Sequence, residues 1–257
     1  MENDERSSNE RPPVVFVPGV IMPAALSYAS LLETLGGEIQ PIVKELEVYA
    51  GDAPPIDYSL ELEIEGVQRT VDAAGLGSFH LIGYSGGGGV SLAFTARYPD
   101  RVRSLALIEP AWSGNDFWTP EEIAELDRVI TLPPNERMRA FIRFQLRPGV
   151  QPPPPPPGPP PPWMGKRPAG AEAMARVFRA SRLDRDRFRH FQQPVYFALG
   201  SLSHPTWERM AETLARLFPH IRVEVYEGRH HLDPPHRAEP ERFARALRDL
   251  WARGEAA

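Results

Sequence analysis

The sequence contains no cysteine, so disulfides, thiolate metal sites and cysteine nucleophiles are all excluded. It also has no apolar run that approaches the roughly 20 residues of a membrane-spanning helix, which predicts that no membrane is among its partners. The first residues are polar and charged, and they lack the apolar stretch of a secretion signal. We therefore expect a disordered leader at residues 1–11 and a cytoplasmic location.

An excess of positive charge is missing as well. Lysine and arginine number 29 against 34 aspartates and glutamates, and the net charge of −5 argues against nucleic acid as a partner. No cluster of potential ligands has the spacing of a metal site, so neither a metal nor a cofactor is expected. A hydrophobic content of 42% and a length of 257 residues are compatible with a single globular domain.

What the chain does contain is an alternation of strand and helix patterns. Short apolar, often β-branched runs predict buried strands, and the helical patterns between them end at glycine or proline. Such alternation with short loops is typical of a doubly wound, mostly parallel sheet of the α/β class. Strands are expected at 13–17, 42–48, 79–84, 102–108, 194–199 and 221–226, and helices at 24–35, 60–74, 86–98, 205–218 and 240–251.

The stretch 111–193 differs, because it has helical patterns but no convincing strand. We interpret it as a helical insertion that divides the sheet portion into residues 12–110 and 194–257. Ten of the eleven residues at 152–162 are proline, and a run almost without N–H groups cannot join a helix or a sheet. We expect a polyproline II strap or a low-complexity expansion there, and the alternative is a docking site for a proline-recognition module. Helices of the insertion are expected at 120–130, 134–146 and 170–180.

The residues Gly83-Tyr84-Ser85-Gly86-Gly87 lie between a predicted strand and a predicted helix. A G-x-S-x-G motif in this context is typical of a nucleophile elbow, a strained turn that exposes the serine hydroxyl. Glycines are needed because neighbouring β-carbons would collide with the flanking elements. The alternative is a glycine-rich turn that arose by chance.

Four segments together resemble the α/β-hydrolase superfamily: VFVPG near the start, GYSGG in the middle, RYPDRVRSLALIEP after it, and EGRHHL before the last helix. The resemblance covers about 13–110 and 194–253. It implies an α/β-hydrolase fold in which the insertion at 111–193 forms a lid. It also implies a serine nucleophile, here Ser85, which needs a general base within hydrogen-bond reach.

The family's catalytic histidine corresponds to His231, at the end of the Gly-Arg-His-His run, and His230 is the alternative base. Consecutive side chains on a loop diverge, so only one of them can face Ser85. Of the other histidines, His80 is expected to pack in the core. His204, His220 and His236 are expected on the surface or as loop tethers.

The acid of the triad departs from the family's commonest pattern. It usually follows the strand at 194–199, but the loop after that strand, Gly-Ser-Leu-Ser-His-Pro, contains no acid. A minority of the superfamily places the acid directly after the strand that the family counts as its sixth. The strand at 102–108 corresponds to it here, and Glu109 follows that strand. A glutamate at the end of a buried strand is costly unless it is paired, which supports this role. Asp116 is a weaker candidate, Asp233 is expected to cap a loop, and an incomplete triad with Ser203 near the acid's usual place stays open.

The oxyanion hole is expected from the backbone N–H groups of Gly86 and Val20. The family often has His-Gly where this chain has Pro18-Gly19. Aromatic residues of the insertion suggest an apolar acyl pocket, or else form the insertion's own core. Eight basic residues between Lys166 and Arg189 suit either a carrier-linked, anionic substrate or a solvated helix face.

These observations predict a serine hydrolase that cleaves an ester, thioester, lactone or related acyl bond of a small-molecule substrate. A lyase or cyclase that uses the same pocket for proton transfer is the alternative, motivated by the missing acid. A non-catalytic receptor is a third hypothesis, and it predicts that Ser85, His231 and Glu109 do not converge in space.

Overall fold

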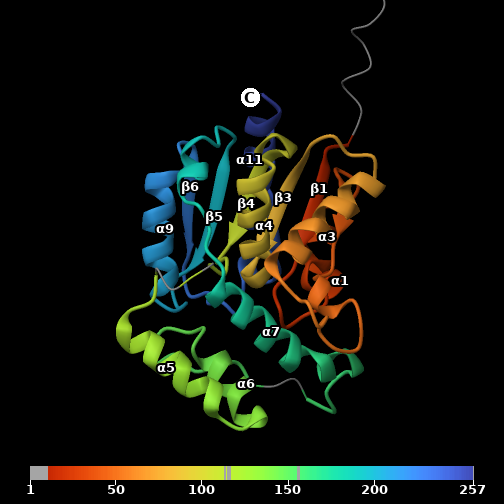
Figure 1. The fold of residues 1–257 in the computed structure, drawn as a ribbon. Helices are drawn as coiled ribbons and strands as arrows, with labels where there is room; N and C mark the ends of the chain where they lie inside the picture. The colour runs from red at the N-terminus through yellow and green to blue at the C-terminus, as the bar shows by residue number, and fades with distance from the viewer. Residues whose placement is uncertain (1–10, 113, 115–116, 155–156, 257) are drawn as a thin grey trace, which may run out of the picture.

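The computed structural model describes residues 11–112, 114, 117–154 and 157–256. Its six-stranded sheet has the order β2-β1-β3-β4-β5-β6, and every neighbouring pair is parallel (Figure 1). The chain therefore winds outward from β1 in both directions, which confirms the doubly wound α/β fold. The strands are β1 (Pro13–Val17), β2 (Gln40–Val43), β3 (Phe79–Tyr84), β4 (Val102–Ile108), β5 (Val195–Gly200) and β6 (Ile221–Tyr226).

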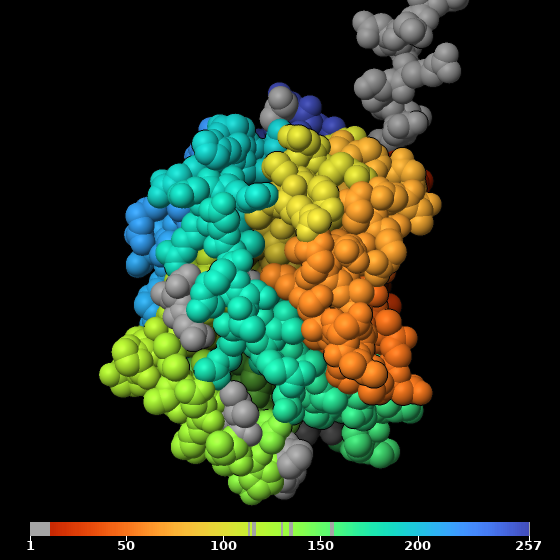
Figure 2. Space-filling model, in the orientation of Figure 1, coloured from red at the N-terminus to blue at the C-terminus, as the bar shows by residue number. Residues whose placement is uncertain are grey.

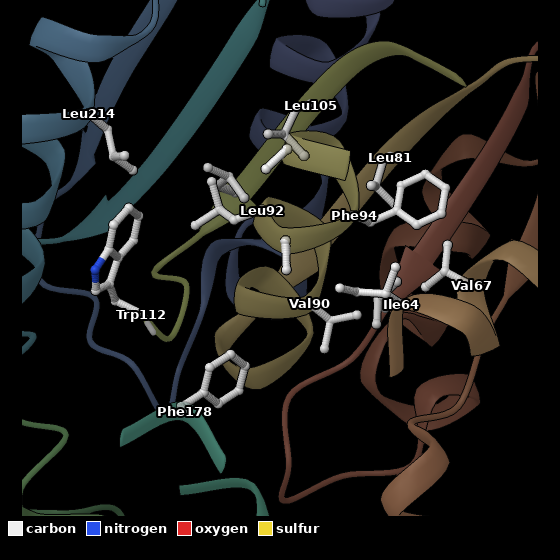
Figure 3. Close-up of a cluster of buried hydrophobic side chains, with 14 of the residues drawn as sticks. Ile64, Val67, Leu81, Val90, Leu92, Phe94, Leu105, Trp112, Phe178 and Leu214 are labelled. Carbon is white, nitrogen blue, oxygen red and sulfur yellow. The ribbon is translucent and has the colours of Figure 1, made fainter. Parts of the chain in front are cut away.

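Helices cover both faces of the sheet, because successive side chains of a buried strand point to opposite sides. Leu81 and Leu105 belong to an apolar cluster with α3 (Leu60–Ala73), α4 (Ser85–Arg97) and α9 (Thr206–Leu217), part of which is drawn in Figure 3. Their neighbours Ile82 and Ala106 belong to a second cluster with α2 (Ala29–Leu35) and α11 (Pro240–Glu255). The two short helices α1 (Ala24–Ser27) and α10 (Pro235–Ala238) complete the sheet portion.

The helical insertion lies beyond the carboxyl ends of the strands, at the lower end of the view in Figure 1. It is tied to the sheet portion by α7 (Arg167–Ala180), where the guanidinium of Arg167 lies 3.9 Å from the ring centre of Tyr49 and donates to Glu45 at 3.1 Å. A β-carbon on Gly170 would lie 2.0 Å from the Tyr49 ring, so α7 can approach this closely only with glycine there. The elements of the insertion are α5 (Pro120–Thr131), α6 (Pro134–Arg143), η3 (Pro162–Lys166), α7 (Arg167–Ala180) and α8 (Asp186–Arg189).

Two predicted segments extend beyond the part of the chain that the structure describes. The leader predicted at 1–11 lies outside it except for Arg11, and residues 155–156 of the proline run lie outside it too. The described remainder of 152–162 is free of helix and strand up to Pro162, where η3 begins. Of the helices in the described ranges, none is long and apolar enough to cross a bilayer.

The strand expected at 42–48 is wrong at its carboxyl end. β2 stops at Val43, and the chain turns into the 3₁₀-helix η1 (Glu47–Tyr49). The reason is the buried carboxylate of Glu63 on α3, which accepts the N–H groups of Glu47 and Val48 at 2.9 and 3.0 Å and draws this segment away from β1. The helix expected at 24–35 is likewise two helices, separated at Tyr28, whose hydroxyl donates to the Val17 carbonyl at 2.7 Å.

Candidate active site

Ser85 occupies the turn between β3 and α4 with a backbone φ of 51°. A positive φ is uncommon for a residue other than glycine and persists only where the surroundings impose it. A β-carbon on Gly83 would lie 2.4 Å from the Ser91 hydroxyl oxygen, and one on Gly87 would lie 2.4 Å from the Pro18 carbonyl oxygen. The glycines therefore let α4 pack directly against β3 and the loop after β1, with the serine at the carboxyl edge of the sheet.

The imidazole of His231 links this serine to a carboxylate. Its Nε2 lies 2.9 Å from the Ser85 hydroxyl oxygen, and its Nδ1 lies 2.8 Å from Oε2 of Glu109. His231 and Glu109 are almost fully buried, at 3% and 2% exposure. The structure thus brings the three residues together in one hydrogen-bonded series. The receptor hypothesis predicted that the three side chains would not converge, so this arrangement contradicts it.

Glu109 directly follows β4 and also has a positive φ, 42°. Its second carboxylate oxygen, Oε1, accepts the N–H of Gly200 at the end of β5 at 2.7 Å. Both oxygens of this buried group therefore have partners, as a buried charge requires. The last residue of β5 thus donates to the Glu109 carboxylate, and the loop after it contributes no acid.

The other candidates lie differently. His230 is half-buried, burial lowers its pKa, and its Nδ1 has no hydrogen-bond partner among the residues with described side chains. Asp233 pairs with Arg229 at 2.9 Å on the same loop. Ser203 is buried, and within the described chain its hydroxyl oxygen has no partner. Asp116 lies outside the described residues.

Gly86 and Val20, the two residues whose N–H groups are predicted to form the oxyanion hole, are neighbours in space. A β-carbon on Gly86 would lie 2.8 Å from a Val20 methyl group. Gly86 is in the first turn of α4, where N–H groups have no partner within the helix and the helix dipole is positive. The hydroxyl of Tyr49 donates to the Val20 carbonyl at 2.7 Å and thereby restrains the loop after β1. The Met174 sulfur, from α7, would lie 2.5 Å from the same β-carbon, so this side chain covers Gly86.

Comparison with known proteins agrees with this geometry. The model of a family described as the alpha/beta hydrolase fold matches residues 51–152. The chain also superimposes on an alpha/beta hydrolase from Sphaerobacter thermophilus with a TM-score of 0.67 and 25% identity, over 95% of this chain and 94% of that one. The chain has the α/β-hydrolase fold, and the family model and this structure together support the α/β-hydrolase superfamily.

Curated hydrolases are similar to this chain over shorter stretches. The putative carbamate hydrolase RutD of Caulobacter segnis is 33% identical over 63 residues, which is 24% of this chain and 23% of that protein. A 2-hydroxy-6-oxononadienedioate/2-hydroxy-6-oxononatrienedioate hydrolase of Escherichia coli is 32% identical over 82 residues, 31% of this chain and 28% of that one. Each match spans only about a quarter of the relative's length. Both relatives are hydrolases by name.

Two contacts of the α/β-hydrolase site were missed by sequence reasoning. The indole of Trp207 stacks on the His231 ring at 4.2 Å and 14°, and its Nε1 donates to the Pro110 carbonyl at 3.1 Å. The Tyr84 hydroxyl donates to the His231 carbonyl oxygen. Tyr84 is the variable position of the elbow motif, so its location was available from the sequence. Trp207 begins a helix far along the chain, and no local signal points to its contact.

The expectation that His236 is a surface residue or loop tether is wrong as regards the surface. The side chain is fully buried, 4.9 Å from the ring centres of both Tyr28 and Tyr84. Burial first, and then the charge of Arg237, holds the pKa of His236 well below its ordinary value. His236 therefore packs against the ring of Tyr84 as a neutral imidazole.

His80 is a core histidine, as expected. Its ring nitrogens lie 2.8 Å from the Ser104 hydroxyl and 2.9 Å from the Glu255 carboxylate, and burial lowers its pKa to about 4. Within the described ranges, no group of three or more histidine, aspartate or glutamate side chains is placed to hold a metal ion.

Proposed function

We propose that the protein is a serine hydrolase that cleaves an ester, thioester, lactone or related acyl bond through an acyl-Ser85 intermediate. The observation that supports this proposal is the hydrogen-bonded series from Ser85 through His231 to Glu109. Each member is held from outside the series: the serine by its turn, the acid by Gly200, and the imidazole by Trp207.

The roles follow from the distances. His231 Nε2 takes the proton of the Ser85 hydroxyl as the oxygen attacks the substrate carbonyl, and Glu109 accepts the Nδ1 proton, which fixes the tautomer and stabilises the imidazolium. The N–H groups of Gly86 and Val20 bind the oxyanion. The imidazolium then gives its proton to the departing alcohol or thiol. Water then attacks the acyl-enzyme and His231 takes a proton from it. As the bond to the Ser85 oxygen breaks, the imidazolium returns this proton to that oxygen, which restores the hydroxyl and releases the acid product.

The helical insertion acts as a lid in this proposal. The Met174 side chain from α7 covers Gly86, whose N–H group is proposed for the oxyanion hole. Methionine is unbranched and flexible, so its side chain can turn aside without disturbing the helix. A substrate therefore enters by displacing Met174 or α7. An acyl group with an apolar part fits the methionine-lined entrance, whether it is free or carried on a larger molecule.

The lyase or cyclase alternative rested on the missing acid after β5. Because Glu109 lies 2.8 Å from His231, that absence no longer argues for it. The curated relatives are also named as hydrolases, one of carbamates and one of an oxo-dienedioate. These names support hydrolysis as the reaction class. A panel of substrates is needed to identify the acyl group of this chain's substrate.

A fluorophosphonate probe tests the proposal directly. It should label the native protein once, at Ser85, and Ser85→Ala should lose both the label and at least about 10⁴-fold in the turnover of p-nitrophenyl or thioester substrates. Ser30→Ala, at an exposed serine on α2, is the matched control and should keep both. If Ser85→Ala kept most turnover of a substrate while His231→Ala abolished it, proton-transfer chemistry without an acyl-enzyme would be the correct function.

A further inference from the structure

A cavity of about 770 Å³ lies inside the helical insertion, between α7 and the hairpin of α5 and α6. Figure 2 shows a hollow between these elements on the surface. Its wall is largely apolar, with Leu126 and Val129 from α5, Met138 and Phe141 from α6, and Ala169 and Ala175 from α7. Cavities that bind small molecules commonly measure about 300–1,000 Å³, so this one has the size of a ligand site.

This cavity is separate from the space in front of Ser85, because α7 lies between them. On its inner face, Met174 covers Gly86 and Phe178 would meet a β-carbon on Gly89. Side chains along a helix turn by about 100° per residue, so Ala175 and Arg176 point to another side. Both of those residues line the cavity, and none of the Ser85, His231 and Glu109 series does.

Three arginines line the cavity, and two of them pair with a carboxylate. Arg137 pairs with Glu172 at 2.5 Å across the cavity, and Arg179 pairs with Asp127 at 2.6 Å. Arg176 also lines the cavity, and in the described part of the chain it has neither an ion-pair nor a hydrogen-bond partner. A guanidinium at the edge of an apolar cavity is suited to bind the planar, two-oxygen head of a carboxylate.

We propose that this cavity is a binding site for an anionic amphiphile, a molecule with one carboxylate or sulfonate head on an apolar body. The head pairs with Arg176 and the body fills the apolar space between α7 and the α5–α6 hairpin. The proposal goes beyond the proposed hydrolysis and does not depend on it, since the ligand lies on the far side of α7 from Ser85.

Titration with 8-anilinonaphthalene-1-sulfonate, followed by its fluorescence, tests this site on the full chain. We expect saturable binding of one probe per protein, displaced by dodecanoate. Arg176→Ala should weaken binding about tenfold through loss of a charge-assisted contact. Ala175→Trp should abolish it by filling the cavity. Arg139→Ala, at an exposed arginine of α6 outside the cavity lining, is the matched control and should change nothing.

Two results would overturn the proposal. One is equal affinity in the native protein, Arg176→Ala and Ala175→Trp, because the probe then binds elsewhere. The other is loss of probe binding after fluorophosphonate labelling, or in Ser85→Ala, because the cavity would then belong to the acyl site. A failure of labelling at Ser85 would contradict the hydrolase proposal alone. Arg176 is exposed, so its variant is expected to fold even if the tryptophan variant does not.

Discussion

Replacing Glu109 by glutamine is the sharpest test of the proposed triad, because it removes the charge but keeps the shape. The carboxylate has two partners that both donate, the N–H of Gly200 at 2.7 Å and Nδ1 of His231 at 2.8 Å. A glutamine has only one accepting oxygen. It can accept from Gly200 or from His231, but its amide nitrogen must then face the other donor.

Each arrangement of Glu109→Gln carries a cost. If the amide nitrogen faces His231, the imidazole must place its proton on Nε2, where it can no longer accept the Ser85 proton. If the nitrogen faces Gly200, a buried donor loses its partner at about 1–3 kcal/mol. In either case the imidazolium loses a countercharge worth about 4 kcal/mol at a separation near 4 Å and an effective dielectric constant near 20. The sum, about 5–7 kcal/mol, corresponds to a loss in kcat of about 10⁴-fold or more.

The assay is kcat of purified Glu109→Gln on the best substrate from the panel, with fluorophosphonate labelling rate as a second readout. Glu63→Gln is the matched control, since Glu63 is also a buried carboxylate that accepts two backbone N–H groups, and it contacts none of Ser85, His231 and Glu109. It should lower the melting temperature and change kcat far less than Glu109→Gln does. A kcat for Glu109→Gln within tenfold of the native value would refute Glu109 as the acid.

Three further changes test the surroundings of the site. Gly87→Ala, whose β-carbon would meet backbone oxygens at 2.4 Å, should lower the free energy of unfolding by about 1–3 kcal/mol in urea titrations, whereas Gly77→Ala, with open space around it, should not. Trp207→Leu should lower kcat several-fold with little change in KM, because the stack that orients His231 is lost; an unchanged kcat would exclude this positioning role. Because burial lowers the pKa of His80 from 6.5 to about 4, the unfolded chain binds a proton in this pH window that the folded protein does not. Stability should therefore fall by up to about 3 kcal/mol as pH drops from about 6.5 to 4, and His80→Gln should flatten that part of the curve.

Most of the strands, the elbow and the parallel α/β class follow from local signals in the sequence. β4 and β6 have the predicted bounds, and β3 leads into Ser85 as the glycine spacing implies. The strand expected at 42–48 failed because its carboxyl end is decided by a carboxylate on another element, Glu63, which no local pattern reveals. The burial of His236 has the same cause, since its environment comes from Tyr28 and Tyr84, remote along the chain.

The register of the sheet explains where Glu109 lies. Tyr84 and Ile108 are paired on β3 and β4, so Ser85 and Glu109 are the next residues on two neighbouring parallel strands. Both have a positive φ, a conformation that costs of order 1–3 kcal/mol each unless the surroundings enforce it.

The enforcing contacts join the two turns to each other and to β5. Ala111 donates its N–H to the Ser85 carbonyl at 2.7 Å, and Gly200 at the end of β5 donates to the Glu109 side chain. The carboxylate therefore reaches the carboxyl end of β5, next to the loop in which the resemblance led us to expect an acid. Because the imidazole of His231 meets a carboxylate there whichever strand supplies it, the loop after β5 can lack an acid without leaving the histidine unpaired.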